Sequence, residues 1–362
     1  MASQKQLIIL IIIMASLTSF LAGYLLTQPS RNSEAIIQQQ RGALIDRFSG
    51  LNENSTPTPL PPGLLQATTD VSLATTNAPD SNAVLYYRPD NGHVSKLDLE
   101  TRLNTTISTA QLIGLTNVIW SPNKNRVITV FRSSTGTMYK YFDYTTHKNG
   151  PLGTNIKDAV FSPDSQRVAL VRSSGTDSAI IITNFEDAGK NPQTILKTRL
   201  NNIHLFWQND RALSFVADDT DAGTQSFYTL SEAGDLSRPL GGESGLAVRW
   251  SPDGTKFLYS AREDSGLTLR VFDVTSQQSQ LMPVQTSATN CAWSLDQRSV
   301  ICASEIQGET SVNKITLTDL TSKILFSNLI ISPKDVFLSH LEDFLVIISA
   351  GDQSIWELKL AN

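Results

Sequence analysis

The chain has 362 residues, and 40% of them are hydrophobic, which excludes a wholly disordered protein because enough apolar surface is present for a sizeable core. The net charge of −5 comes without a block of basic residues, so nucleic acid is excluded as a partner, since phosphate binding needs clustered lysine and arginine. With only two cysteines, neither a disulfide framework nor a four-cysteine zinc site can form.

An uncharged segment at residues 7–26 is the first element along the chain, and it reads LIILIIIMASLTSFLAGYLL. As a helix it spans about 30 Å, the thickness of the hydrocarbon core of a bilayer. The segment is longer than the apolar core of a cleaved signal peptide, and it lacks a clear small-x-small cleavage site. We therefore predict an uncleaved transmembrane signal anchor; a cleaved signal peptide and a buried core helix are the alternatives.

Residues 1–6 are too short to form a domain, which decides the expected orientation of the anchor. Lys5 before the segment and Arg31 and Arg41 after it nearly balance each other under the positive-inside rule. We expect residues 1–6 to form a short cytoplasmic tail and the larger C-terminal part to be exported. We therefore predict a single-pass membrane protein in a bacterial envelope, with its folded domain outside the cytoplasm.

Residues 27–64 form the predicted stalk. A short helix over residues 31–48, pairing with itself or lying on the membrane surface, is an alternative to a plain polar spacer. Residues 57–62 contain four prolines, which prevent a helix and favour an extended chain. The sequence therefore predicts a semi-rigid linker between the membrane and a domain at residues 65–362.

From residue 65 to residue 362 the chain repeats a pattern with a period near 43 residues. Each copy has an apolar strand ending in an aromatic residue, then a polar turn and further β-rich segments. The aromatic residues of the five strong copies are Trp120, Phe161, Trp207, Trp250 and Trp293. Weaker copies at Asn77 and Leu338 bring the number to seven. Because the aromatic residues recur once per copy, we interpret them as structural anchors that pack between sheets.

Four short strands per copy predict one blade of a β-propeller. In the clearest copy, residues 246–250 form the first strand, the turn 251–254 supplies proline, aspartate and glycine, and residues 257–261 and 267–273 form the next strands. The predicted fold class is therefore all-β, with seven four-stranded blades, and six or eight blades as alternatives. The last copy lacks a fourth strand, and residues 65–76 are expected to supply it and close the ring.

The sequence WSPDG at residues 250–254, with the strands that follow it, resembles the TolB-type, WD-like β-propeller repeats. The resemblance covers residues 77–362, although the copies at Asn77 and Leu338 lack the aromatic residue. It implies a propeller that takes part in protein interactions, and it does not supply a partner.

Residues 218–223 form an acidic loop, the one candidate metal site in the sequence. Asp218, Asp219 and Asp221 offer carboxylate oxygens, the ligands that calcium prefers; a solvated hairpin tip is the alternative. No G-x-S-x-G nucleophile motif is complete, since residues 242–246 lack the final glycine, and no H-E-x-x-H zinc motif occurs. We therefore expect no catalytic residue, no cofactor and no enzymatic activity.

Cys291 and Cys302 lie on the first and second predicted strands of one copy, which a tight turn joins. If Trp293 lies opposite Val300, antiparallel pairing also places Cys291 opposite Cys302. Export to an oxidising compartment would permit a disulfide. We hypothesise this cross-strand disulfide, with two buried thiols as the alternative.

The predicted architecture is a rigid disc held off a membrane by a stalk. We predict a membrane-anchored, extracytoplasmic scaffold that binds a protein partner, with residues 7–26 as its contact with the membrane. The alternative is a carbohydrate-binding or carbohydrate-active propeller that uses the mouth of the central channel. Polar side chains and aromatic rings that converge in one channel pocket would favour this alternative, and a flat face with apolar patches would favour the scaffold.

Overall fold

The computed structural model describes residues 63–360, except residues 135, 188, 209–212, 220–222, 265 and 307–308. The chain divides into two compact units, Met1–Pro59 and Leu60–Asn362, and every described residue belongs to the second. The predicted anchor at residues 7–26 and almost all of the predicted stalk lie outside the described residues. Within the described part of the chain, no helix has the length and apolar character needed to cross a membrane.

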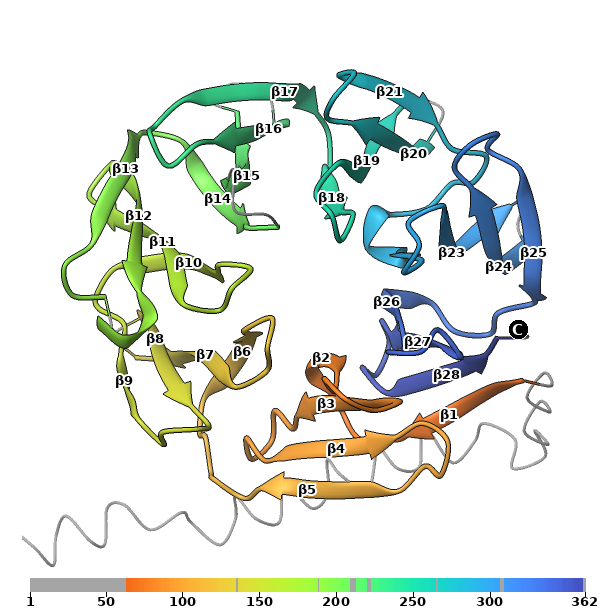
Figure 1. The fold of residues 1–362 in the computed structure, drawn as a ribbon, viewed down its shortest axis with the longest axis horizontal. Helices are drawn as coiled ribbons and strands as arrows, with labels where there is room; N and C mark the ends of the chain where they lie inside the picture. Colours follow the sequence, from red (N-terminus) through yellow and green to blue (C-terminus); the bar gives the residue numbers. More distant parts are fainter. Residues whose placement is uncertain are drawn as a thin grey trace, which may run out of the picture. The chain divides into compact units, whose positions relative to one another are not determined.

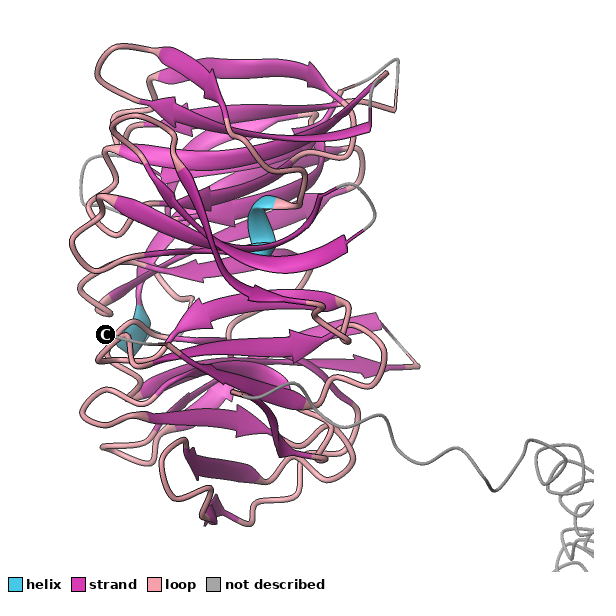
Figure 2. Ribbon diagram, turned by 90° about the vertical axis from the view of Figure 1, so that its right-hand side faces the viewer, coloured by secondary structure: helices cyan, strands magenta, loops and turns pink. Residues whose placement is uncertain are grey.

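The described residues form seven four-stranded sheets, arranged in a ring around a central axis like the blades of a propeller (Figure 1). In blades 1 to 6, neighbouring strands are antiparallel and consecutive in the chain, and the first strand lies nearest the axis. Figure 2 shows the ring from the side, with the loops gathered on its two faces. The predicted all-β propeller with seven blades is confirmed, and the alternatives of six and eight blades are excluded.

The strands are numbered in chain order, and each blade is described from the axis to the rim. Blade 1 is β2 (Leu73–Asn77), β3 (Ala83–Tyr87), β4 (Val94–Asp98) and β5 (Asn104–Ser108); blade 2 is β6 (Leu115–Trp120), β7 (Arg126–Ser133), β8 (Gly136–Asp143) and β9 (Asn149–Pro151); blade 3 is β10 (Ile156–Phe161), β11 (Arg167–Ser174), β12 (Asp177–Asn184) and β13 (Gln193–Thr198). Blade 4 is β14 (Asn201–Phe206), β15 (Leu213–Asp218), β16 (Gln225–Leu230) and β17 (Leu236–Glu243); blade 5 is β18 (Ala247–Trp250), β19 (Lys256–Glu263), β20 (Gly266–Asp273) and β21 (Gln278–Leu281); blade 6 is β22 (Cys291–Trp293), β23 (Ser299–Ile306), β24 (Glu309–Thr316) and β25 (Ser322–Ser327). Blade 7 is β26 (Pro333–Leu338), β27 (Phe344–Ser349), β28 (Ile355–Lys359) and β1 (Leu64–Thr68), and two 3₁₀ turns, η1 (Phe185–Asp187) and η2 (Ala288–Asn290), complete the described elements.

Strand β1 closes the ring. It precedes blade 1 in the chain, yet it pairs with β28 at the rim of blade 7, where Leu64 lies opposite Leu358. Residues 65–76 were expected to supply this strand. The strand that closes the ring is shorter than this expected segment. It ends at Thr68, and the inner strand of blade 1 begins at Leu73. The pairing covers an edge of β28 that would otherwise be open to other strands.

The hydrophobic core lies between neighbouring blades. Strands β3 and β27 are buried along their whole length, because each sheet packs against another blade on either side. One cluster of buried residues joins Ile180 of blade 3 to Phe215 of blade 4. Continuous apolar runs such as FLVIIS at residues 344–349 are therefore the sequence signature of this packing.

A serine and an aspartate shape the turn between the first two strands of several blades. In blade 3, the backbone N–H of Arg167 donates to Ser162 Oγ (2.8 Å) and that of Gln166 donates to Asp164 Oδ1 (3.0 Å). Residues 251–254 repeat the arrangement in blade 5, where the glycine at the fourth position has a φ of 68°. Local hydrogen bonding and a left-handed backbone thus explain why the sequence S-P-D-G favours this turn.

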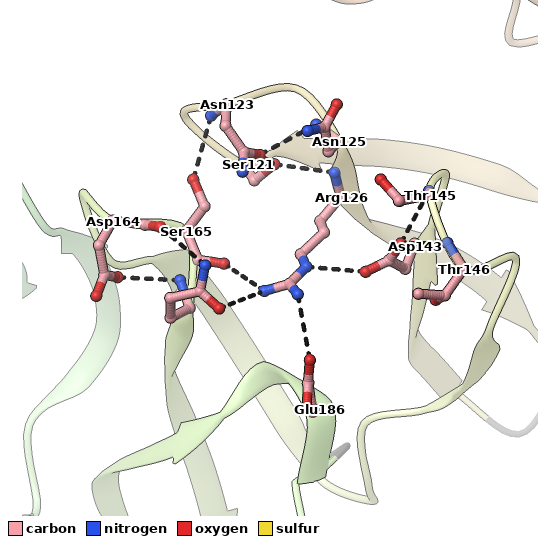
Figure 3. Close-up of polar contacts among 11 residues, drawn as sticks. Ser121, Asn123, Asn125, Arg126, Asp143, Thr145, Thr146, Asp164, Ser165 and Glu186 are labelled. Atoms are coloured by element: carbon pink, nitrogen blue, oxygen red, sulfur yellow. Dashed lines mark hydrogen bonds and ion pairs between the residues drawn. The ribbon is translucent and has the colours of Figure 1, made fainter.

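Arg126 shows how the turns of neighbouring blades are joined (Figure 3). Its Nε donates to Asp143 Oδ2 of blade 2 (2.9 Å), and its Nη1 donates to the backbone oxygen of Ser165 in blade 3 (2.8 Å). A carboxylate oxygen of Glu186 lies 3.6 Å from Nη2, and the guanidinium carbon lies 4.7 Å from the centre of the Phe185 ring. Because protein groups occupy these donors and the side chain is 12% exposed, Arg126 joins blades and is not a ligand site.

Candidate functional site

The repeated aromatic residues connect each blade to the one before it. Three of their indole N–H groups donate to the preceding blade, from Trp120 to Ala74 O (2.8 Å), from Trp250 to Ser214 Oγ (2.9 Å) and from Trp293 to Arg249 O (3.4 Å). Trp207 packs under the guanidinium of Arg167 from blade 3, 5.0 Å from its ring centre. Phe161 is buried with side chains of blade 2. These contacts place all five residues at joints between blades.

The acidic residues proposed for calcium lie at the end of β15. Asp218 accepts two side-chain amide hydrogen bonds, and Asp219 accepts hydroxyl hydrogen bonds from Ser226 (2.6 Å) and Thr224 (2.9 Å). The bond from Ser226 is the main cause that holds the pKa of Asp219 below its ordinary value. Asp221 lies outside the described residues, and the described ones contain no group of three His, Cys, Asp or Glu side chains able to hold a metal. The calcium site therefore stays a prediction.

Cys291 and Cys302 form a disulfide between the first two strands of blade 6. The register of β22 and β23 places them opposite each other, as it does Trp293 and Val300. Their Cα atoms are 4.0 Å apart, and both residues are fully buried. The bond therefore lies inside the blade, out of contact with any ligand at the surface.

A pocket of about 620 Å³ lies along the inner wall of the ring between blades 4 and 5, and we call it the inner-wall pocket. Strand β14 supplies one side of it with Asn202, His204 and Phe206. Ile203 and Leu205, which alternate with these residues, are buried in the blade. The two-residue period of a strand produces this division, because successive side chains point to opposite faces.

His204 is held in place by a carboxylate of the neighbouring blade. Its Nδ1 lies 3.0 Å from Asp158 Oδ2, and the same oxygen accepts the backbone N–H of Leu205 (2.7 Å). The imidazole stands edge-on to Phe206, with 4.8 Å between ring centres, and the side chain is 66% exposed. The hydrogen bond with Asp158 raises the pKa of His204 above its ordinary value. A solvent-facing imidazole that a carboxylate orients is suited to hydrogen bonding and to proton transfer.

Strand β18 forms the other side of the inner-wall pocket with Arg249 and Trp250. Arg249 Nη1 donates to Val336 O and Nη2 donates to Thr289 O, each at 3.0 Å, and Nη2 also contacts the carboxylate of Asp335. The contacts with Val336 and Asp335 cross from blade 5 to blade 7. They are within reach because β22, the inner strand of blade 6 between them, is only three residues long. The guanidinium is thus fixed at the inner wall.

The inner-wall pocket combines aromatic rings with groups that donate and accept hydrogen bonds. Phe206 and Trp250 offer rings, and the amides of Asn202 and Gln225 line the same space. Its two basic side chains each contact an aspartate of another blade, so neither is free to pair with an anionic ligand. Such a lining suits an uncharged ligand with both apolar faces and hydroxyl groups.

No motif in the sequence marks His204, Arg249 or Asp158 as site residues. The four histidines lie far apart in the chain, and the inner strands carry only the repeated aromatic residue as a conspicuous feature. The usable signal was the polar–apolar alternation in residues 201–206 and an arginine directly before Trp250. Neither feature reveals that the two strands share a pocket, because this depends on how blades 4 and 5 pack against each other.

No family model matches the chain, and no curated protein matches it. An oligogalacturonate lyase from Vibrio parahaemolyticus has a similar structure, with a TM-score of 0.60 at 12% identity over 83% of this chain and 94% of that one. The β-propeller domain of the Trilobed protease from Pyrococcus furiosus has a TM-score of 0.54 at 11% identity, over 81% and 96% of the two chains. TolB from Acinetobacter baumannii has a TM-score of 0.44 at 14% identity, over 79% and 78%. The likenesses to the lyase and to the Trilobed protease domain show the propeller fold, and the assignment to the TolB-type repeats stays a prediction.

The prediction that the protein is not an enzyme is wrong, because its grounds do not exclude enzymatic activity. It rested on the absence of nucleophile and zinc motifs from the sequence. The oligogalacturonate lyase is an enzyme with the same propeller fold, so a propeller with these seven blades is compatible with catalysis. Function depends on the site that a fold carries and not on the fold itself, so the absence of contiguous motifs does not exclude catalysis.

Proposed function

We propose that the protein is a membrane-anchored, extracytoplasmic β-propeller that binds a carbohydrate in the inner-wall pocket. The observation that supports this function is the convergence of Phe206, His204 and Arg249 on one pocket of the inner wall. A sugar presents C–H faces that pack on aromatic rings and hydroxyl groups that pair with amide, imidazole and guanidinium groups. Because the basic groups of the pocket already contact aspartates, the pocket favours a neutral sugar over a strongly acidic one.

A glycan array probed with the full-length protein tests this function. We expect binding to a group of related neutral glycans, and we expect Phe206→Ala and His204→Ala to reduce that binding by about tenfold or more, a loss of about 1.4 kcal/mol. Phe337→Ala and His340→Ala are matched controls, because both residues lie on blade 7 and neither lines the pocket. Failure to bind any glycan, or equal binding by all four variants, would contradict the proposal. Mass spectrometry of the bound glycans would show whether they are also cleaved.

The proposed location follows from two features. Residues 7–26 are uncharged and long enough to span a bilayer, and the disulfide between Cys291 and Cys302 suits an oxidising compartment. Carbonate extraction of membranes and protease treatment of intact cells test this location. We expect the protein to stay in the membrane pellet and the propeller to be open to protease from outside the cytoplasm.

A second candidate function is the protein-interaction scaffold, and exposed apolar side chains on blades 6 and 7 favour it. Ile324 is 57% exposed, Leu341 is 61% exposed and Leu295 is 66% exposed. Apolar residues that gather on a surface mark interaction sites more often than single ones do. Crosslinking in cells with mass spectrometry tests this function, and recovery of no reproducible protein partner would contradict it.

A further inference from the structure

A second hollow, of about 410 Å³, lies between blades 6 and 7. We call it the blade 6–7 groove and define it by the apolar residues Ile324, Leu325 and Leu341 and by the basic residues Lys314, Lys323 and Lys359. These residues come from β24, β25, β28 and the turn between β26 and β27. Figure 1 shows blades 6 and 7 as neighbours in the ring.

The apolar side of the blade 6–7 groove is held in one conformation by both neighbouring blades. The backbone N–H of Leu341 donates to Asn82 Oδ1 of blade 1 (3.3 Å). The next residue, Glu342, accepts the backbone N–H of Leu295 from blade 6. The turn that carries the exposed Leu341 side chain is thus tied on both sides. A partner that buries this leucine would lose little entropy from ordering the turn.

The basic side of the groove has unbalanced charge. Lys314, Lys323 and Lys359 are all exposed, and none of them forms an ion pair with a described carboxylate. Glu342 lines the groove too, but its carboxylate already accepts the hydrogen bond from Leu295. Three lysines against one glutamate leave the groove positive.

We infer that the blade 6–7 groove binds an acidic amphipathic peptide segment of a protein partner. Two features of the groove select this ligand: apolar side chains pack on Ile324 and Leu341, and flanking aspartates or glutamates pair with the lysines. An anionic membrane surface shares the charge but needs protruding apolar side chains to enter the bilayer, whereas this surface is hollow. The inference rests on the scaffold function proposed above and names the chemistry of the partner segment.

Selection of peptides from a random display library on the purified full-length protein tests the inference. We expect the enriched peptides to carry acidic residues on either side of bulky apolar residues. In fluorescence anisotropy with one such peptide, Lys323→Glu and Ile324→Ser should each weaken binding by about tenfold, as expected for residues at the centre of an interface. Lys148→Glu and Ile113→Ser are matched controls, because both residues are exposed and lie on blade 2 or its entry.

Three results would overturn the inference: enrichment of basic or neutral peptides, absence of enrichment, or equal loss of affinity in the control variants. Binding of the protein to phosphatidylglycerol vesicles that depends on Lys323 and Ile324, without peptide binding, would also overturn it and identify a membrane surface. Crosslinking in cells separates this failure from failure of the scaffold function. A partner whose crosslinks map to another surface would support the scaffold function and contradict the groove as its binding site.

Discussion

At the scale of single residues, the joint between blades 7 and 1 contains a buried charge. Glu357 on β28 is 1% exposed, and one of its oxygens accepts Arg102 Nε of blade 1 at 3.0 Å. Its other oxygen has no hydrogen-bond partner. Burial raises the pKa of Glu357 above its ordinary value, and the bond with Arg102 lowers it by less. The ionised form is therefore costly in the folded ring.

Glu357→Gln should change how stability depends on pH. The folded state of the natural protein holds a proton on Glu357 more tightly than the unfolded state, whose value is near 4.5. Its stability contribution is therefore present below pH 4.5 and falls as the pH rises through the raised value. Glutamine does not ionise, so the variant should gain in Tm relative to the natural protein, by about 2–4 °C for each kcal/mol, between pH 4.5 and neutral pH. Parallel Tm profiles in scanning fluorimetry would contradict this prediction.

Trp250→Phe tests the indole hydrogen bond between blades 5 and 4. Ser214 is 2% exposed, and its Oγ accepts the indole N–H of Trp250 (2.9 Å). The variant leaves this hydroxyl without its donor, which should cost about 1–2 kcal/mol of unfolding free energy. Ser214→Ala and the double variant complete a cycle in urea, from which we expect a coupling energy of about 1 kcal/mol. Additive losses would mean that the bond does not join the blades.

At the scale of elements, the inner strands differ more than the middle strands do. The second strands are apolar and buried in every blade, because both of their faces meet other sheets. The inner strands vary in length, and β22 has only three residues. The shortness of β22 lets Arg249 of blade 5 reach β26 of blade 7, which shapes the inner-wall pocket. The proposed binding site on this ring therefore depends on an irregular element and not on the repeat itself.

The disulfide across β22 and β23 predicts a simple labelling result. Maleimide should label no cysteine in the denatured, unreduced protein purified from its natural source, and two cysteines per chain after reduction. Replacement of both by serine should cost about 2–4 kcal/mol of unfolding free energy, the usual contribution of a disulfide. Labelling of both thiols before reduction would remove the bond and the argument for an oxidising compartment.

At the scale of the whole molecule, the ring is closed by one strand. Among the described residues, three strands of blade 7 come from the end of the domain, and the fourth, β1, comes from its start. Leu64 on β1 is fully buried with Trp356 and Leu358 of the last blade. The first and last strands of the propeller thus stabilise each other within blade 7.

Leu64→Ala measures how much this closure contributes. The side chain has no exposure, so its truncation should cost about 2–5 kcal/mol of unfolding free energy, as for other buried leucines. Leu65→Ala is the matched control, because Leu65 lies on the same strand but is only half-buried, and it should cost less. Equal and small losses in urea unfolding of the two variants would show that β1 does not hold the ring together.

Much of the fold is local and could be predicted from the sequence. The turn at residues 251–254 forms through hydrogen bonds within six residues. Polar turns after an aromatic residue recur near every 43 residues, and this recurrence revealed the blades. The pairing of Cys291 with Cys302 followed from the same cause, since a tight turn decides the register of the strands that it joins. The site could not be predicted in this way, because Asp158 and His204 are 46 residues apart and belong to different blades.

By itself the sequence determined the all-β class and the blade unit, and it favoured seven blades, because periodic strands and turns are encoded within each copy. Only the tertiary structure decided which side chains of different blades share a space. The inner-wall pocket needs Arg249 to meet Asp335, 86 residues further along the chain, and the blade 6–7 groove needs Ile324 beside Leu341. The physical reason is that the packing of blades around the ring brings together side chains that lie far apart in the chain, and no short stretch of sequence carries that information.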